Sequence, residues 1–598
     1  MPKASSIENI RHSLAHLLAA AVMDIWPDAK RTIGPAIDSG FYYDFAFAKP
    51  ISDADLARIE KKMREILPTW DKFTKTEVTA AAAKKEYKDN PFKLELIEDL
   101  AKAKEKITLY TSGNFTDLCR GGHVSSAKEI KADAFKLTHI AGAYWRGNEK
   151  NPMLTRIYGL AFGTKKELDD YLRLQEEAKK RDHKKLGQDL DLFTFSDLVG
   201  AGLPLWTPKG TVVRNLLDNF VWELRRAKGY QQVEIPHITK KNLYEKSGHW
   251  DKFKNELFLI ITREGHEFAM KPMNCPHHTQ IFARKPHSYR EMPQRYANTT
   301  IVYRDEQSGE LAGLSRVRAI TQDDAHVFAR HSQIKEEIIK IWDIVDEFYS
   351  AFGFPLQIRL SLHDPKAKDR YLGNPKTWQE AEDTLRAIAK QKKVKAEEGI
   401  GEAAFYGPKV DFIAKDSLGR QWQVATIQLD MNMPERFDLA CINEKGEKER
   451  IVMIHAAIMG SIERFLSIII EHYAGAFPLW LSPVQVAVLP INDEVVKYAE
   501  QVAASLSSPL RGEGRVRVEI DARNESIGKK IREAEKQKTP YMLIIGKKEV
   551  EAGTVSVRQR ASVRRSLGEG GAEKDLGSMK LEKFFEKIKK EIETKSIS

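Results

Sequence analysis

Hydrophobic positions near the start of the chain recur at the spacing of an amphipathic helix, from Glu8 to Met23. The Trp-Pro-Asp run at 26–28 ends this predicted helix, because proline cannot continue it. From Gly34 to Asp44 turn residues precede an apolar run, a pattern that favours turns followed by a strand. The order of these elements predicts that an α/β domain begins at once.

A charged segment at 164–185 contains few turn residues and favours a helix that connects domains rather than one buried in a core. The length of 598 residues also exceeds what one hydrophobic core supports. We therefore expect an N-terminal domain at 1–163, the connecting helix at 164–185, a middle domain at 186–480 and a C-terminal domain at 481–598.

The two later domains differ in their hydrophobic pattern. The middle domain mixes helical patterns with β-rich runs such as 403–413 and 421–429, whose pairing the pattern leaves open. In the C-terminal domain, apolar runs at 484–489 and 541–545 alternate with helical patterns. That alternation is typical of a small α/β domain with a parallel core.

Two segments of the C-terminal domain, at 505–514 and 562–573, differ from their surroundings in composition. Both contain a Ser-Leu pair and a Gly-Glu-Gly run. We predict that both are loop insertions without chemistry.

Composition argues against a membrane or secreted protein. The chain is 42% hydrophobic and 30% charged, in the range of soluble globular proteins. Its most apolar stretch, 451–470, is interrupted by His455, Glu463 and Arg464, and it contains no run of about 18 apolar residues. The first residues lack the apolar region of a signal peptide. We expect a cytoplasmic protein that does not enter a membrane.

The cysteines indicate the redox compartment of the protein, and the net charge indicates what kind of partner it binds. Cys119, Cys275 and Cys441 lie far apart, which does not suit a disulfide scaffold and fits a reducing compartment. The 96 Lys and Arg against 85 Asp and Glu give a charge of +11, which favours a polyanionic partner such as nucleic acid. A solvated surface with a Lys-rich end at 580–595 explains the same excess, so both interpretations stay open.

A first group of chemical side chains lies near the N-terminus. His12 and His16 are four residues apart in the predicted helix and so share one of its faces. Asp117, Cys119 and His123 add a carboxylate, a thiol and an imidazole at close spacing. The group fits a metal site, a metal-free hydrolytic site, or packing and surface histidines, and the residues alone leave these three open.

A second group lies in the middle domain, where arginines and carboxylates alternate around Arg304, Glu306 and Arg316. Planar guanidinium groups suit a triphosphate, because they grip phosphate oxygens and offset charge at the reacting phosphorus. Further along, Gly460 and Ser461 permit close approach of a flat ligand while Arg464 reaches an anion or a base. The alternative for the group around Arg304 is a surface ion-pair network. The alternative for the segment with Arg464 is a buried helix that carries one surface arginine.

The remaining candidate metal ligands are too far apart in the sequence for their spacing to indicate a common site. Cys275, His326 and His455 are separated by 51 and 129 positions, so they form no short zinc signature. A lone histidine in an apolar run, such as His455, is more often a hydrogen-bonded core residue than a ligand.

Several motifs together resemble the class II threonyl-tRNA synthetases in colinear order along nearly the whole chain. They are HSLAH (12–16), DLCRGGH (117–123), KPMNCPHH (271–278), YRDE (303–306), RVRAITQDDAH (316–326), AFYGPKVDF (404–412), TIQLD (426–430), IHAAIMGSIERF (454–465), RNESIGKKIREAE (523–535) and DLGSM (575–579). The resemblance implies an α/β multidomain (α+β) protein with a six- to seven-stranded antiparallel class II catalytic sheet. It adds an N-terminal α+β editing domain and a C-terminal α/β anticodon-binding domain.

The resemblance also implies an activity and its partners. The expected enzyme is a homodimer that activates threonine with ATP and Mg²⁺ and transfers it to tRNA(Thr). One Zn²⁺ per subunit would be held by Cys275, His326 and His455 in a three-ligand open site that binds the amino and hydroxyl groups of threonine. A site built around that hydroxyl rejects valine strongly, but the missing methyl of serine is worth only about 1–3 kcal/mol, so a hydrolytic second site is expected.

By the same resemblance, residues receive individual roles. Arg304 would hold the α-phosphate, Glu306 would touch adenine, and Arg316 and Arg464 would take the γ-phosphate. His249 would lie near the terminal ribose of tRNA. The remaining sets are Met273, Gln322, Asp324, Tyr406, Lys409, Gln428 and Ser461 around the amino acid or adenylate; His12, His16, Lys93, Asp117, Cys119 and His123 in seryl-tRNA hydrolysis by water without metal; and Glu549 and Arg558 at the anticodon.

The chain departs from the family pattern in a few places. It begins directly at the editing-type motifs, so we expect the small ubiquitin-like domain common in the family to be absent. CRGGH, HAAIMGS and RVRAI replace the usual CRGPH, HRAILGS and RVRGF, and none of these changes removes a proposed ligand. A non-catalytic tRNA-binding paralogue would lose phosphate-gripping arginines or metal ligands, and all of these are present. The combination of MNCP, TQDDAH and the editing motifs argues against a class II synthetase for serine or proline.

Overall fold

The computed structural model describes residues 6–508, 515–561 and 574–597. The chain forms two compact units, Met1–Glu177 and Ala178–Ser598. The predicted insertion at 562–573, and the one at 505–514 from residue 509 on, lie outside the described residues. Within the described ranges, no helix is both long enough and apolar enough to cross a bilayer.

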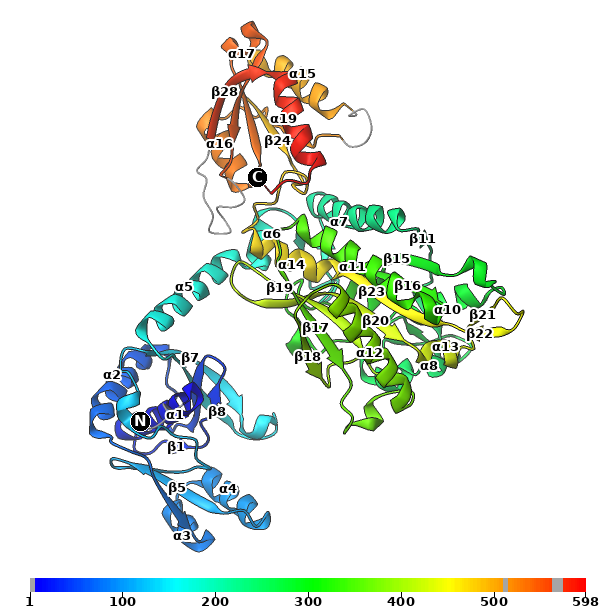
Figure 1. Cartoon of the computed structure of the whole chain (residues 1–598). Coiled ribbons are helices and arrows are strands. Elements are labelled where there is room, and N and C mark those ends of the chain that lie inside the picture. Colours follow the sequence, from blue (N-terminus) through cyan, green and yellow to red (C-terminus); the bar gives the residue numbers. More distant parts are fainter. Residues whose placement is uncertain (1–5, 509–514, 562–573, 598) are drawn as a thin grey trace. The chain divides into compact units, whose positions relative to one another are not determined.

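The N-terminal unit packs helix α1 (Ile7–Ile25) against an antiparallel sheet (Figure 1). The Ser6 side chain caps α1 by accepting from Asn9 N at 3.3 Å, and the helix ends at Ile25, just before the Trp-Pro-Asp run, as the pattern predicts. The sheet runs β1 (Lys30–Arg31), β3 (Gly40–Ala46), β8 (Met153–Ala161) and β7 (Phe135–Tyr144), with β2 (Ala36–Ile37) paired to β3. Its other elements are α2 (Leu56–Ile66), α3 (Ala80–Glu86), α4 (Pro91–Lys102) and a second sheet of β4 (Thr74–Val78), β5 (Ile107–Ser112) and β6 (Phe115–Leu118).

The connecting segment is two helices, whereas the sequence predicts one. Helix α5 (Lys165–Arg181) ends before Asp182, which begins α6 (His183–Asp189). The Asp182 carboxylate accepts from Lys184 N at 2.8 Å, and a side chain that caps a new helix start interrupts the preceding one.

An eight-stranded sheet organises the first part of the second unit (Figure 1). Its six central strands are antiparallel, as the resemblance implies, and one further parallel strand lies at each edge. The order is β11 (Gln231–Gln232), β15 (Gln294–Tyr303), β16 (Ala319–Ala329), β23 (Val452–Ser461), β20 (Gln421–Asp430), β19 (Lys409–Lys415), β17 (Leu356–Leu362) and β18 (Ala396–Ile400). The predicted run at 403–413 becomes a strand only from Lys409.

Alternation along these strands separates a core face from a polar face. Ala325 and Val327 on β16 and Ile454 on β23 belong to the main apolar core. Their neighbours Asp324 and His326 therefore project from the opposite face. The core side is covered by α7 (Pro208–Ala227), α11 (Ile334–Ser350), α12 (Pro375–Gln391) and α14 (Ile462–His472).

Short elements surround this sheet. They are α8 (Lys241–Ser247), α9 (His249–Lys252), α10 (Cys275–Ala283) and α13 (Asn432–Arg436), the pairs β9 (Phe193–Thr194) with β10 (Leu205–Trp206) and β21 (Ala440–Ile442) with β22 (Lys448–Arg450), and the sheet β12 (Ile238–Lys240), β14 (Glu267–Met270), β13 (Leu259–Ile261). Helix α10 contacts β16, and Cys275 is its first residue. This contact brings the cysteine to the sheet that carries His326.

The last part of the chain is a five-stranded mixed sheet with helices. β24 (Val486–Pro490) pairs in parallel with β25 (Val518–Ile520) and β26 (Tyr541–Ile545), which confirms the predicted parallel core. β27 (Thr554–Gln559) and β28 (Lys574–Lys580) extend the sheet antiparallel, which the apolar runs did not indicate. Its helices are α15 (Val496–Ser507), α16 (Ile527–Lys536), α17 (Lys547–Ala552) and α19 (Leu581–Glu593).

Candidate functional site

One row of directly paired residues crosses four strands of the eight-stranded sheet. Lys409 pairs with Gln428, Gln428 with His455, and His455 with His326. Residues paired in this way project from the same face of a sheet. Asp324 lies two residues before His326 on that face, so five predicted site residues from distant segments gather there.

Three of the predicted residues form a compact donor group. Ligand atoms of Cys275, His326 and His455 all lie within 4.8 Å of one another, and the three side chains are buried. His326 Nε2 and His455 Nδ1 are 3.1 Å apart. The fold thus brings together three side chains that sequence spacing could not join.

Hydrogen bonds around the histidines fix where their lone pairs can point. His455 Nε2 lies 2.8 Å from Asp430 Oδ2, and a carboxylate can only accept, so Nε2 carries the proton and Nδ1 presents a lone pair. His326 Nδ1 lies 2.7 Å from Nδ1 of His278. When His326 donates to His278, its Nε2 also presents a lone pair toward His455.

This arrangement fits a bound zinc ion. In this tautomer the two imidazole lone pairs, 3.1 Å apart, repel each other unless a cation lies between them, and the Cys275 sulfur would complete the three-ligand set of an open zinc site. A carboxylate behind a ligating histidine, as Asp430 lies behind His455, is the usual orienting partner in such sites.

The remaining predicted amino-acid contacts surround this group. The Tyr406 ring stacks on His455 with centroids 4.8 Å apart, and its hydroxyl donates to Gln428. Asn274 Nδ2 donates to Asp324 Oδ2 at 3.1 Å. Met273 packs, partly buried, in the apolar cluster around Cys275.

His249 lies next to the cysteine. Its Nε2 is 3.6 Å from Cys275 Sγ, and its Nδ1 is 2.8 Å from Ser247 Oγ. The side chain is fully buried, with Phe253 and Phe405 against the ring. The imidazole is therefore closed to solvent in this structure.

A cavity of about 580 Å³ opens on the same sheet. Arg304 Nε is buried and, among the described residues, has no hydrogen-bond partner. Burial lowers the pKa of Arg464, which has no ion-pair partner among those residues. Cationic groups without a fixed counter-charge suit an anionic ligand. The predicted residues that line the cavity are Arg304, Glu306, Arg316, Gln322, Ser461 and Arg464.

Two of these residues are engaged with each other. Arg316 Nη2 lies 2.7 Å from Glu306 Oε2 and 2.9 Å from Glu310 Oε2. A phosphate must displace at least part of this pairing to reach Arg316. Ser461 Oγ accepts from Arg464 N at 3.2 Å and so caps α14 at the cavity edge.

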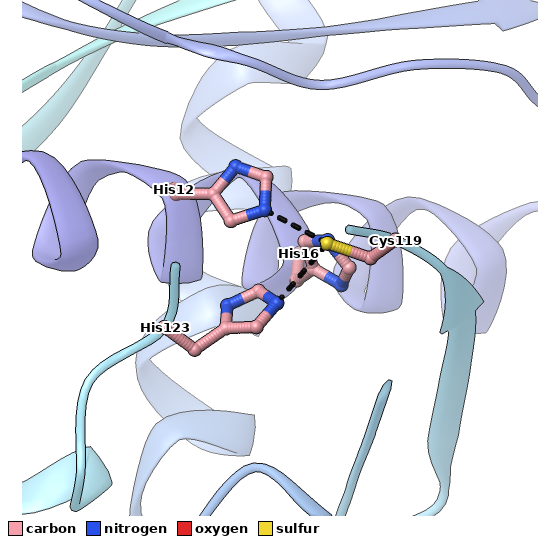
Figure 2. Close-up of side chains that lie close together, drawn as sticks. All are labelled: His12, His16, Cys119 and His123. Atoms are coloured by element: carbon pink, nitrogen blue, oxygen red, sulfur yellow. Dashed lines mark hydrogen bonds between the residues drawn. The ribbon is translucent and has the colours of Figure 1, made fainter. Parts of the chain in front are cut away.

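The N-terminal unit holds a second donor group (Figure 2). His12 and His16 project from one face of α1, and Cys119 and His123 follow β6. Cys119 Sγ lies 3.0 Å from His12 Nε2 and 3.4 Å from His123 Nε2. Burial raises the pKa of Cys119 to about 11 and lowers that of His16 to about 3 and that of His123 to about 2. The group is therefore a neutral thiol among neutral imidazoles near pH 7.

A buried ion pair adjoins this cluster. Lys93 Nζ lies 2.7 Å from Asp117 Oδ1, and Arg31 Nε lies 3.3 Å from the same atom. Tyr43 donates to Asp117 as well. Burial would raise the pKa of Asp117, but Lys93, His16 and Arg31 outweigh it and lower that pKa. All six residues predicted for this site thus lie in one connected region.

The two predicted anticodon residues lie on the last sheet and its helix α17. Glu549 Oε2 accepts from Gly546 N at 2.9 Å and so caps the start of α17. Arg558 lies half-exposed on β27, opposite Met542 of β26 and Asp575 of β28. Both are partly exposed to solvent, and no hydrogen bond or ion pair joins these two described residues.

Three models of known protein families match separate segments of the chain. The class II tRNA synthetase core domain (G, H, P, S and T) matches residues 253–473, an anticodon-binding domain matches 485–591, and the second additional domain of threonyl- and alanyl-tRNA synthetases matches 107–158. A threonine–tRNA ligase of Porphyromonas gingivalis is 49% identical over 97% of this chain and 87% of its own length. One of Rubrobacter xylanophilus is 46% identical over 98% of this chain and 88% of its own length.

The chain belongs to the threonyl-tRNA synthetase family. It carries the class II core, the anticodon-binding domain and the editing-type domain of that family. Among solved structures, the RNA-binding domain of the threonyl-tRNA synthetase from Cryptosporidium parvum matches with a TM-score of 0.62 and 36% identity, over 68% of this chain and 98% of that one. A prolyl-tRNA synthetase of Giardia lamblia shares the fold at a TM-score of 0.53 and 17% identity, over 70% of this chain and 81% of that one.

Sequence reasoning about this synthetase missed several residues at its sites. Asp430 and His278 lie inside the recognised motifs TIQLD and KPMNCPHH, yet they received no role although they hold the two zinc-type histidines. Tyr43 and Arg31 lie outside the editing motifs and reach Asp117 only through the fold. Asp430 and His278 could have been found, because each lies in a motif that also holds a predicted site residue. For Tyr43 and Arg31 the sequence contains no comparable indication.

Proposed function

We propose that this chain is a threonine–tRNA ligase that activates threonine with ATP, transfers it to the 3′ end of tRNA(Thr), and hydrolyses mischarged seryl-tRNA in its N-terminal unit. The observation that carries the proposal is the presence, on one sheet, of a zinc-type donor group and a cationic cavity. Relatives named threonine–tRNA ligase along almost the whole chain support the same activity.

In the amino-acid site, Cys275, His326 and His455 would hold Zn²⁺, which when bound supplies two coordination positions to the amino and hydroxyl groups of threonine. Asp324 lies on the same face of the sheet and is suited to accept a hydrogen bond from that hydroxyl. Asn274 already orients the Asp324 carboxylate at 3.1 Å. Because valine has no hydroxyl, it would deprive this buried carboxylate of the hydrogen bond that threonine donates.

Residues of the same row would place the rest of the amino acid. Tyr406 is held by its hydrogen bond to Gln428 and by stacking on His455. Lys409 is paired with Gln428 across the strands and lies 2.8 Å from Asp411 through its Nζ atom. We assign these residues, with Met273, Gln322 and Ser461, to binding of threonine and the adenylate.

In the cavity, Arg304 would hold the α-phosphate while the threonine carboxylate attacks it and pyrophosphate leaves. Its buried Nε has a hydrogen to donate and no partner among the described residues. Arg464 and Arg316 would take the γ-phosphate, the latter after it releases Glu306, which then faces adenine. Fixed positive groups lower the barrier because they meet negative charge as it develops, and Mg²⁺ would accompany the ATP.

In the N-terminal unit, His12, His16, Cys119 and His123 would position a water molecule against the seryl ester without a metal. Neutral imidazoles can accept a proton from that water, and their lowered pKa values keep them neutral. Lys93 and Asp117 form a fixed ion pair beside them. We further propose that Glu549 and Arg558 contact anticodon bases and that His249 acts near the terminal ribose.

The proposed division of the chain is editing at 1–163, a connector at 164–185, catalysis at 186–480 and anticodon binding at 481–598. A cytoplasmic homodimer is also proposed. Support for a second copy comes from the fully exposed Leu198 and the exposed Leu259 and Ile261, apolar side chains of the kind that an interface covers.

The proposal is tested by charging tRNA(Thr) with labelled threonine. Substitution of Arg304 by alanine should lower charging at least a hundredfold, since one preorganised donor is worth about that much. Arg290→Ala, on an exposed side chain outside the cavity, is the matched control and should charge normally. Absence of charging by the folded, zinc-loaded protein would overturn the proposal.

A further inference from the structure

His183 connects three segments that lie far apart in the sequence. Its Nδ1 is 2.6 Å from Glu471 Oε1, and its Nε2 is 3.0 Å from Leu314 N. A backbone N–H can only donate, so Nε2 accepts and the proton lies on Nδ1, which donates to Glu471. The side chain is buried, with 4% of its surface exposed. The imidazole is thus a neutral bridge with both nitrogens in use.

The first end of the bridge lies in the β15–β16 loop, residues 304–318. This loop carries Arg304, Glu306 and Arg316, which line the cavity. Leu314 precedes Arg316 by two residues and anchors the loop, because its side chain is fully buried in the main core while its N–H is held by His183.

The loop also packs closely against the imidazole. Gly313 has φ +56°, a conformation that favours glycine, and a Cβ there would lie 2.4 Å from His183 Nε2. The backbone at Gly313 therefore lies directly against the imidazole, next to the hydrogen bond from Leu314. Any change in the position of His183 must shift the loop near Arg316.

The second end of the bridge lies on α14. Glu471 is near the C-terminal end of this helix, whose first turn places Arg464 in the cavity. The Glu471 carboxylate also accepts from His183 N at 3.1 Å and from Arg420 Nη2 at 2.5 Å. Burial would raise the pKa of Glu471, but the hydrogen bonds from His183 and Arg420 lower it, so the acceptor stays charged.

Asp182, His183 and Glu471 could by composition be a metal site, since their donor atoms lie within 4.8 Å of one another. The hydrogen bonds argue against this, because Nδ1 and Nε2 of His183 are both committed to protein partners. A metal ligand would have to give up one of these bonds. The group is better explained as a structural link to the cavity.

We propose that His183 is a positioning residue for ATP: it fixes the β15–β16 loop relative to α14, so that Arg316 and Arg464 address the same triphosphate. The inference rests on the proposed function in that ATP is the ligand of the cavity. It extends that function to the connector, because His183 is the first residue of the helix that follows Asp182.

Two substitutions separate the two hydrogen bonds. In His183→Gln the amide reaches the position of Nε2 and can still accept from Leu314 N. In His183→Asn the shorter amide occupies the position of Nδ1, so it can donate to Glu471 but does not reach Leu314. Lys185→Gln changes an exposed neighbour on the same helix and serves as the control.

The measurements are the ATP dissociation constant by calorimetry and the KM values and kcat of threonine-dependent pyrophosphate exchange. His183→Asn should raise the Kd and KM for ATP about tenfold, the order expected for one hydrogen bond, with kcat and the KM for threonine little changed. His183→Gln should recover most of the affinity. Hydrogen exchange of the 304–318 loop should become faster in His183→Asn than in His183→Gln.

Each outcome decides the proposal. Equal ATP affinity in wild type and His183→Asn, or equal losses in both variants, would overturn it, because the contact with Leu314 would then have no specific effect. Seryl-tRNA hydrolysis by the N-terminal unit and the unfolding midpoint report whether each variant is folded. A wild-type protein that binds ATP without threonine-dependent exchange would contradict the proposed function, while calorimetry on the variants would still decide the role of His183.

Discussion

Asp430 Oδ2 lies 2.8 Å from Nε2 of His455. Asp430 belongs to β20 and His455 to β23, which are neighbouring strands of the eight-stranded sheet. The bond fixes the histidine tautomer and turns Nδ1 toward His326 and Cys275. The geometry of this proposed zinc site is therefore set by sheet register, in which Gln428 pairs with His455 and Asp430 follows two residues later. The carboxylate that orients the ligand and the ligand itself belong to one β-ladder.

Asp430→Asn should weaken zinc affinity about 10- to 100-fold, the usual effect of losing such an orienting partner. Zinc transfer to a chromophoric chelator measures the affinity. Asp383→Asn, on an exposed side chain of α12, is the matched control. Unchanged zinc affinity in Asp430→Asn would contradict the role given to the hydrogen bond.

Asp324 provides a second test. Asp324→Ala removes the proposed acceptor for the substrate hydroxyl and should raise the KM for threonine at least about tenfold, since a hydrogen bond to a charged group contributes about 1.5–3 kcal/mol. The KM for ATP should change little, because Asp324 does not line the cavity. Pyrophosphate exchange at varied threonine and varied ATP separates the two. A parallel rise in both constants would indicate a general disturbance of the sheet instead.

Removal of metal should affect the site of threonine activation but not the hydrolytic site. A chelator should abolish threonine activation, because it removes the zinc proposed to be held by Cys275, His326 and His455. Seryl-tRNA hydrolysis in the N-terminal unit should stay intact. Both rates can be followed on one preparation before and after chelation. If hydrolysis were also lost and returned with zinc, the four-residue group of His12, His16, Cys119 and His123 would hold a metal, as its donor set permits.

Acid should destabilise the N-terminal unit in a defined range. Burial lowers the pKa of His16 to about 3, whereas the unfolded imidazole has a pKa of 6.5. The unfolded state therefore binds protons first as the pH falls, so this contribution to stability is complete above pH 6.5 and is lost progressively toward pH 3. At pH 5 the loss is about 2 kcal/mol for one such group. Urea unfolding at several pH values should show this fall in the free energy of unfolding, and His16→Gln should make the fall smaller. An unchanged pH dependence in the variant would assign the effect to other groups.

Much of the fold followed from local pattern. Helix α1 and strand β3 were predictable because an apolar stripe, a proline and turn residues mark them within a few positions. The break at Asp182 was not, because the segment 164–185 favours a helix throughout, and the contacts that hold Arg181 and His183 there come from distant parts of the chain. The antiparallel pairing of β26 with β27 was equally hidden, since an apolar run carries no strand direction.

The sites divide in the same way. Motif resemblance named Cys275, His326 and His455, and their gathering depends on the pairing of β16 with β23 and on α10, which bring together residues up to 180 positions apart. Tyr43 could not be predicted at the editing-type site, because its hydroxyl reaches Asp117, which lies on a strand of a different sheet, only in the folded unit. Sequence identifies chemistry that lies within motifs, while partners from outside the motifs require the fold.

Threonine-dependent ATP–pyrophosphate exchange, measured before and after zinc removal and with serine and valine as competing substrates, would show whether this chain activates threonine through a zinc site. We expect threonine to support exchange, zinc removal to abolish it and added zinc to restore it, with serine weakly active and valine inactive. Exchange that survives complete zinc removal, or folded and zinc-loaded protein that shows none with threonine, would contradict this expectation.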